Sequence, residues 1–418
     1  MEKIVLENGL TVALTEQPNA HSAAVAFYIA SGNRFETLQN SGISHFIEHM
    51  LFKGTNSRSY HDIAKESDIM GGQLNAYTAK EYTCLYSRAL SEHVSRTLHL
   101  MCDMICNPLF DEDDIKTEKG VVLEEIGMYE DSPEDYCSDM LNALCYNNNP
   151  LGFNILGTRE TVSQMTSDML RKYMGSMYAP ERIVVSLCGG FNRAEVLEIL
   201  DRYFGGMKNT SNPLNYESCN ISGGVSLCKR KVEQTQIAFC FNGLSSQHPL
   251  KYAASFVSSM LGGASSSRIN RRIREEMGLA YSAYTFSSNY LGTGMFGVFA
   301  GLAHKNQEKY LKEAAKIIKE FKNSITEEEI LLTKEQFKAS VALSNENMSA
   351  IAASAGKQLL LLDDYIDLGQ TLRRIDEVTI DTVREAADLI TNPDIVAVSV
   401  VGDARHEDYY KNLFQKSF

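Results

Sequence analysis

Apolar residues recur along the chain in two patterns: short, near-continuous runs and longer segments with a helical period. The short runs predict buried strands, and the helical period predicts amphipathic helices. In the first half, the predicted strands are Ile4–Leu6, Leu10–Leu14, Ala23–Ala30, Leu74–Thr78, Tyr82–Leu90 and Ile183–Leu187. The predicted helices there are Gly42–Phe52, Tyr60–Met70, Glu92–Cys106, Asp111–Met128 and Arg193–Tyr203.

A stretch from Gly205 to Gly224 is rich in Asn, Ser, Gly and Pro and interrupts this pattern. Such a composition is typical of a linker. The length of 418 residues also favours more than one domain. We therefore expect an N-terminal domain at 1–207, a linker at 208–224 and a C-terminal domain at 225–418.

The two halves resemble each other at four places that occur in the same order. The matched pairs are SHFIEHML with ASFVSSML, GGQLNAYT with GLAYSAYT, FDEDDIKTEKGVVLEEI with ITEEEILLTKEQFKASV, and IVVSLCGG with VAVSVVGD. A repeat of about two hundred residues is too long for a solenoid. We expect an α+β fold of two duplicated domains, each a largely antiparallel sheet with helices packed on one face.

Within the first predicted helix, His45, Glu48 and His49 form the pattern H-x-x-E-H. On a helix, residues three and four apart share a face, so both imidazoles can bind one metal ion and the carboxylate can reach a water on it. The plain alternative is an ordinary amphipathic helix. In the second copy these positions are Ser255, Ser258 and Ser259, although the apolar residues persist. The duplicated helix therefore does not need this triplet for packing.

A catalytic zinc ion usually has three protein ligands and one open position. The acidic helix at Asp111–Met128 offers Glu118 and Glu125, which are seven apart and share a face. Glutamates on such a helix are usually solvated. Both are replaced in the second copy, by Thr333 and Ser340, so these carboxylates disappear together with the histidines.

With these motifs the chain resembles the pitrilysin/insulinase (M16, inverzincin) zinc metallopeptidases, and most closely their processing-peptidase-like branch. The resemblance rests on H-x-x-E-H and on the EKGVVLEE segment, and it extends through GGQLNAYT, the Asn-Pro-Leu-Gly segment at Asn149 and RRIREEMGLAYS from Arg271. It covers nearly the whole chain.

The resemblance implies one Zn²⁺ per chain, bound by His45, His49 and Glu125. It implies that Glu48 is the general base and that Glu118 orients a ligand. The chemistry agrees, because zinc lowers the pKa of bound water to about 7 and a nearby carboxylate can take its proton.

The same resemblance gives roles to two further pairs of residues. Asn75 and Ala76 match a strand that binds extended peptide by strand addition. Arg274 and Tyr281 match an arginine and a tyrosine that bind substrate or stabilise the oxyanion. Without the family, the plain interpretations are a packed strand, a surface arginine and a strand tyrosine.

By analogy with two-subunit relatives, Arg274 and Tyr281 would come from a partner chain. The expected assembly is a homodimer that encloses a closed chamber, because this chain carries both the metal set and the Arg/Tyr pair. Some relatives instead pair an active subunit with an inactive one.

The composition narrows the classes of partner and compartment. A net charge of −13 without a basic patch argues against the binding of nucleic acid. The same charge allows cationic peptide substrates, although a need for solubility explains it as well. No secretory signal and no run of about twenty apolar residues occurs, so no membrane association is expected. Nine cysteines, an odd number, indicate free thiols and a reducing, cytoplasmic location.

Three functions compete. The first is a zinc-dependent endopeptidase acting on unfolded peptides or leader segments. The second is a catalytically silent scaffold or partner subunit with the same fold, which the intact His45, Glu48, His49 and Glu125 argue against. The third is a structural zinc domain, which would need a fourth protein ligand that the sequence does not offer.

Overall fold

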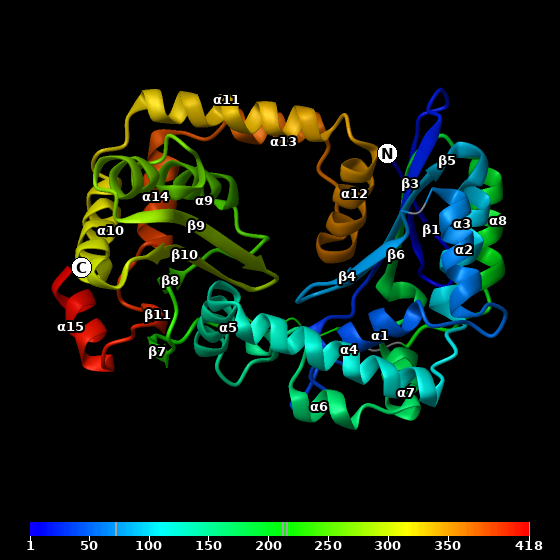
Figure 1. The fold of residues 1–418 in the computed structure, drawn as a ribbon. Coiled ribbons are helices and arrows are strands. Elements are labelled where there is room, and N and C mark those ends of the chain that lie inside the picture. Colours follow the sequence, from blue (N-terminus) through cyan, green and yellow to red (C-terminus); the bar gives the residue numbers. More distant parts are fainter. Residues whose placement is uncertain (72, 211–212, 215, 217, 418) are drawn as a thin grey trace. The chain divides into compact units, whose positions relative to one another are not determined.

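Two α+β units make up the computed structural model, which describes residues 1–71, 73–210, 213–214, 216 and 218–417. Figure 1 shows one sheet in each unit, with helices around it. The first unit consists of Met1–Ile126, Phe153–Leu214 and Ala342–Asp367. The second consists of Gly127–Gly152, Asn215–Val341 and Leu368–Phe418. This arrangement confirms the expected α+β class.

The sheet of the first unit has six strands in the order β1-β2-β6-β3-β5-β4. All neighbours are antiparallel except β2 and β6, which are parallel. The strands are β1 Glu2–Val5, β2 Thr11–Glu16, β3 Ser22–Ile29, β4 Asn75–Thr78, β5 Thr83–Leu90 and β6 Ile183–Gly189. The short strand β4 forms one edge of this sheet.

The helices predicted for the first half are present and pack on one face of this sheet. The helices of this unit are α1 Ile43–Leu51, α2 Tyr60–Met70, α3 Val94–Cys106, α4 Glu112–Asp131, α6 Arg159–Gln164, α7 Ser167–Met177, α8 Arg193–Phe204 and α12 Met348–Leu362. Helix α4 continues beyond Ile126 into residues of the second unit. Short 3₁₀ helices lie at Asn33–Phe35, Ser91–His93 and Pro180–Arg182.

The other face of the first sheet is covered by α12, which comes from the second half of the sequence. This face carries buried residues such as Tyr28 and Val184, so it needs an apolar cover. The fit is close, because a Cβ at Gly356 of α12 would lie 2.4 Å from the Tyr28 ring. Helix α12 therefore belongs to the first core.

The sheet of the second unit has five strands in the order β7-β11-β8-β10-β9, with only β7 and β11 parallel. The strands are β7 Gly224–Lys229, β8 Thr235–Asn242, β9 Ala280–Tyr290, β10 Thr293–Leu302 and β11 Ala397–Gly402. This order repeats β2-β6-β3-β5-β4 strand for strand. The structure thus confirms the duplication, and among the described residues β1 has no counterpart.

Helices of the second unit follow the same plan. They are α5 Pro133–Cys145, α9 Lys251–Ser258, α10 Gln307–Phe321, α11 Glu327–Ser344, α13 Leu368–Asp376, α14 Ile380–Ile390 and α15 Glu407–Ser417. Wider π-helical turns lie at Ser259–Gly263 and Asn270–Glu276, and 3₁₀ turns lie at Pro150–Gly152 and His304–Asn306. Helix α5, from the first half of the sequence, packs on β8 and β11 through Cys137 and Leu141.

The two units therefore differ from the continuous halves expected at 1–207 and 225–418. Each sheet takes one covering helix from the other half, because its central strands are apolar on both faces. The division between Leu214 and Asn215 falls inside the expected linker. Four residues of that linker, and Gly72 of the Gly71-Gly72 turn, lie outside the described residues.

None of the helices in the described ranges is both long enough and apolar enough to cross a bilayer.

Candidate active site

Helix α1 begins at a tightly packed glycine. Gly42 has a φ of +90°, and a Cβ there would lie 2.6 Å from the carbonyl oxygen of Leu156. No side chain at the N-cap position caps the helix, but the buried carboxylate of Glu36 accepts hydrogen bonds from the backbone N–H groups of Gly42, at 2.7 Å, and Ser44, at 2.9 Å. A carboxylate at this end suits the helix dipole. The start of α1 is therefore held from outside the helix.

The apolar side of α1 then fixes its rotation. Phe46, Ile47, Met50 and Leu51 are fully buried in the first core. Four such side chains stabilise the packed helix by roughly 1.5–3 kcal/mol each. The remaining positions of the helix carry the H-x-x-E-H triplet, so packing of the apolar side determines where the polar side chains point.

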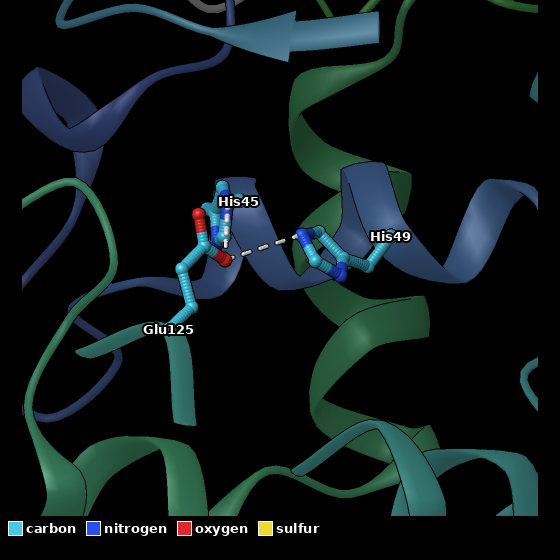
Figure 2. A group of neighbouring side chains, drawn as sticks. All are labelled: His45, His49 and Glu125. Carbon is cyan, nitrogen blue, oxygen red and sulfur yellow. Dashed lines mark ion pairs between the residues drawn. The ribbon is translucent and has the colours of Figure 1, made fainter. Parts of the chain in front are cut away.

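His45, His49 and Glu125 converge on one point from two helices, α1 and α4. One ligand atom from each lies within 4.8 Å of the other two. The Nε2 atoms of His45 and His49 each lie 3.7 Å from Oε2 of Glu125. Figure 2 shows the two imidazoles facing this carboxylate from different sides. This is the one group of three or more potential ligands found among the described residues.

The donor set and its spacing fit zinc. Two ligands about 2.0–2.1 Å from a tetrahedral zinc are about 3.4 Å apart, and the observed 3.7 Å is close to that value. A hydrogen bond between the same atoms would be shorter. Two histidines and one glutamate also leave one coordination position open, which is the pattern of catalytic rather than structural sites.

Glu118 lies behind His49, on the opposite side of the imidazole from Glu125. Its Oε1 is 2.7 Å from Nδ1 of His49, and its Oε2 is 2.5 Å from Nζ of Lys53. Burial favours the neutral acid, but the hydrogen bond with His49 and the ion pair with Lys53 outweigh it and hold the pKa of Glu118 below its usual value. Spacing alone left open which glutamate meets the histidines, and the family resemblance assigned that place to Glu125. In the structure the two carboxylates occupy different positions.

The two imidazoles have unlike surroundings. Burial lowers the pKa of His45 to about 3, and the nearby His49 acts in the same direction. Its Nδ1 is buried and has no hydrogen-bond partner in the part of the chain that the structure describes. For His49, burial also disfavours the charged form, but its hydrogen bond with Glu118 outweighs this and raises the pKa. His45 is therefore neutral at neutral pH, as a metal ligand must be.

Glu48 points to a strand rather than to α4. Thr78 of β4 donates a hydrogen bond of 2.5 Å from its hydroxyl to Oε2 of Glu48. Burial raises the pKa of Glu48, against the opposing effect of this hydrogen bond. A carboxylate with a raised pKa is better suited to accept and return a proton near neutral pH.

The duplicated domain contains a corresponding strand-to-helix contact. Thr285 and Ser258 occupy the places of Thr78 and Glu48, and the Thr285 hydroxyl donates to the carbonyl oxygen of Ser258 at 2.7 Å. Thus the threonine meets the helix in both copies, but only the first copy presents an acid to it. Sequence reasoning missed the Thr78 contact, although the AYT match between the copies was visible.

Asn75 and Ala76 lie on β4, whose one partner among the described strands is β5. The Asn75 side chain is exposed, and its Oδ1 accepts a hydrogen bond from the backbone N–H of Ala76 at 2.8 Å. No strand of the described ranges pairs with the other edge of β4.

Arg274 and Tyr281 lie in the second unit and contact each other. The guanidinium of Arg274 is 5.4 Å from the centre of the Tyr281 ring, and Tyr281 is 80% exposed. Arg274 also pairs with Glu275 at 3.3 Å. Neighbouring arginines are engaged elsewhere, since Arg268 pairs with Glu329 at 2.7 Å. Arg274 and Tyr281 thus lie together at the surface of the second unit.

Comparison with known proteins agrees with the resemblance found in the sequence. Residues 11–159 match the family described as Insulinase (Peptidase family M16), and residues 164–337 match the Peptidase M16 inactive domain. YmxG of Bacillus subtilis (strain 168), described as an uncharacterized zinc protease, is 35% identical over 388 residues. The match covers 93% of this chain and 95% of that relative.

Two solved structures share the fold. A protease from Helicobacter pylori superposes with a TM-score of 0.87 at 21% identity, covering 96% of this chain and 99% of that chain. A peptidase M16 inactive domain from Pseudomonas fluorescens gives a TM-score of 0.90 at 19% identity, covering 97% and 99%. On the family matches and the identity to YmxG, the chain belongs to the insulinase family of peptidases, family M16.

Proposed function

We propose that the chain is a zinc-dependent endopeptidase that hydrolyses unfolded peptides or leader segments. The observation that carries this proposal is the convergence of His45, His49 and Glu125 on one point, next to the buried acid Glu48 on the same helix. Membership of a peptidase family and similarity to a named zinc protease support it.

In this proposal His45, His49 and Glu125 hold one zinc ion per chain. When bound, zinc would supply Lewis acidity and a water of lowered pKa. Glu118 keeps the proton of His49 on Nδ1, so that Nε2 faces the ligand group.

Glu48 is the general base. Because Thr78 donates to its Oε2, the other carboxylate oxygen, Oε1, takes the proton of the attacking water and passes it to the leaving amine. Burial of Glu48 excludes bulk water that would compete for this proton. General acid–base catalysis of this kind contributes about 10²- to 10⁴-fold to the rate.

The substrate binds as an extended segment along the open edge of β4, at Asn75 and Ala76. Backbone hydrogen bonds would supply affinity, which explains why the peptide must be unfolded. The net charge of −13 favours cationic segments over acidic ones.

The proposed assembly is a homodimer with a closed chamber, in which the partner chain supplies Arg274 and Tyr281. Both side chains can donate hydrogen bonds to developing negative charge. Mixing Arg274→Ala chains with Glu48→Gln chains tests this arrangement, because one intact site forms only if the residues act in trans. Confirmed mixed dimers without recovered activity would contradict it.

A catalytically silent scaffold of the same fold is the second candidate. The observation in its favour is the match of residues 164–337 to a domain described as inactive. That match covers the copy with serines in place of the H-x-x-E-H triplet. The first copy retains the two histidines and the glutamate of the triplet, and Glu125.

The experiment that separates the two is hydrolysis of a broad library of unstructured peptides by the purified protein. The proposal predicts cleavage that chelation abolishes and added zinc restores. A protein that retains zinc yet cleaves no peptide of the library would favour the scaffold.

A further inference from the structure

Lys53 lies just beyond α1 and forms the far end of a chain of contacts, Lys53–Glu118–His49. We infer that Lys53 is a positioning residue for the metal site, which acts through Glu118 to hold the His49 imidazole in its ligating orientation. This inference rests on the proposed zinc site and assigns it a residue that neither the motif nor the family matches single out.

The backbone around Lys53 directs its side chain. Its N–H donates to the carbonyl oxygen of Met50 at 3.2 Å, which continues the last turn of α1. Its ammonium then lies 2.5 Å from Oε2 of Glu118 and 5.7 Å from the centre of the Tyr60 ring. The lysine side chain is about one quarter exposed, whereas that of Glu118 is 4% exposed. The pair is thus largely shielded from solvent on the Glu118 side.

Glu118 has one oxygen for each neighbour. With Lys53 on Oε2, Oε1 remains directed at Nδ1 of His49. That contact keeps the imidazole proton on Nδ1. It leaves Nε2, which faces Glu125, without a proton and with its lone pair directed at the ligand group. Without Lys53, the carboxylate would be buried with one oxygen uncompensated and would be free to turn.

The duplicated domain supports the link between these three residues. Gly263, Thr333 and Ser259 occupy the places of Lys53, Glu118 and His49 there. The lysine is therefore absent from the copy that lacks the carboxylate and the imidazole. A lysine needed only to end the helix would be as useful in the second copy.

The Lys53–Glu118 pair orients one of the two imidazoles. Nδ1 of His45 has no hydrogen-bond partner within the described residues, so the Lys53–Glu118 pair orients His49 alone. Loss of Lys53 should consequently weaken zinc retention without removing a ligand. Substitution of groups that orient metal ligands typically costs about 10- to 100-fold in metal affinity.

The test measures zinc transfer from the loaded protein to a chromogenic chelator. Lys53→Met should release zinc about 10- to 100-fold faster than wild type, with Lys53→Gln as a second neutral variant if Lys53→Met does not fold. Lys53→Arg keeps the charge and should retain zinc nearly as wild type does. Lys3→Met is a control for loss of a lysine away from the site, because Lys3 forms a 2.6 Å ion pair with the exposed Asp363.

A double variant shows whether Lys53 affects zinc release through Glu118 or independently of it. In a Glu118→Gln background, Lys53→Met should add little to the rate of zinc release. Wild-type release rates in Lys53→Met, or an undiminished effect in the Glu118→Gln background, would overturn the inference. Failure of wild type to bind zinc would instead refute the proposed metal site itself.

Discussion

The Thr78 hydroxyl donates a hydrogen bond of 2.5 Å to Glu48, and so connects the edge strand β4 to the side of α1 that carries His45 and His49. The strand is where we place the substrate backbone, and the acid is the proposed base. In the second copy, Thr285 donates instead to the backbone carbonyl oxygen of Ser258. A contact between this strand and this helix thus holds, in the first copy, an acid beside the edge strand.

Replacing Thr78 by valine removes the donor but preserves the shape of the side chain. A hydrogen bond to a charged group contributes about 1.5–3 kcal/mol, so we expect kcat to fall roughly 10- to 100-fold. Zinc content should not change, and Thr78→Ser should retain most of the activity. The measurement is steady-state kinetics with zinc analysis of the same samples; an unchanged kcat in Thr78→Val would show that the hydrogen bond does not orient the base.

Glu125 and its neighbour Glu124 offer a matched comparison on one helix. Glu125 is close to both imidazoles, whereas Glu124 is exposed on another face. Glu125→Gln should weaken zinc binding by more than about 100-fold, beyond the effect expected for an orienting residue. Glu124→Gln should bind zinc as wild type does. Equal zinc affinities of the two variants, measured by competition with a chelator, would remove Glu125 from the ligand set.

Strand addition at β4 predicts a period of two along the substrate. In a strand paired at one edge, alternate residues direct their backbone groups towards the partner. N-methylation at those alternate positions of a peptide should lower kcat/KM by about 10-fold or more, and methylation at the positions between them should have little effect. A methylation scan with no alternation would contradict binding along this edge.

The Asp103 carboxylate should stabilise the fold by an amount that depends on pH. Its carboxylate accepts hydrogen bonds from Thr55 at 2.6 Å, Ser57 at 2.8 Å and Arg58 at 2.6 Å. Burial favours the neutral acid, but these donors outweigh it and lower the pKa of Asp103 from its usual value of 3.8. The stabilisation is therefore complete above about pH 4 and is lost as pH falls below that value through the folded-state pKa.

Asp103→Asn should accordingly reduce the free energy of unfolding by about 2–3 kcal/mol at neutral pH. The difference from wild type should shrink at lower pH, since the wild-type carboxyl is then protonated as well. Urea unfolding of both proteins from pH 3 to pH 7 checks this. A difference that stays constant over that range would mean that the Asp103 charge does not stabilise the fold.

Local pattern predicted the elements that carry the site. The apolar positions of α1, among them Phe46 and Met50, required a buried helix, and helical spacing then placed His45, Glu48 and His49 together. The duplication was also visible, because matched segments kept their apolar residues while the polar ones changed. These features depend on neighbours in the sequence or on direct comparison of the two halves.

Contacts between distant segments were not predictable in the same way. Helices α5 and α12 each cover the sheet of the other half, and an apolar helix face does not specify which sheet it meets. The Lys53–Glu118 pair depends on how α4 crosses the end of α1. A lysine that follows a helix usually remains solvated, so nothing in its local sequence distinguished Lys53.

The central claim is that this chain uses Glu48 as a base at a zinc site formed by His45, His49 and Glu125. Its most direct test compares peptide hydrolysis by wild type and Glu48→Gln, each loaded with an equal amount of zinc. We predict about one zinc per chain in both proteins, cleavage by wild type, and a loss of about 10²-fold or more in Glu48→Gln. Equal rates of cleavage by the two zinc-loaded proteins would contradict the account.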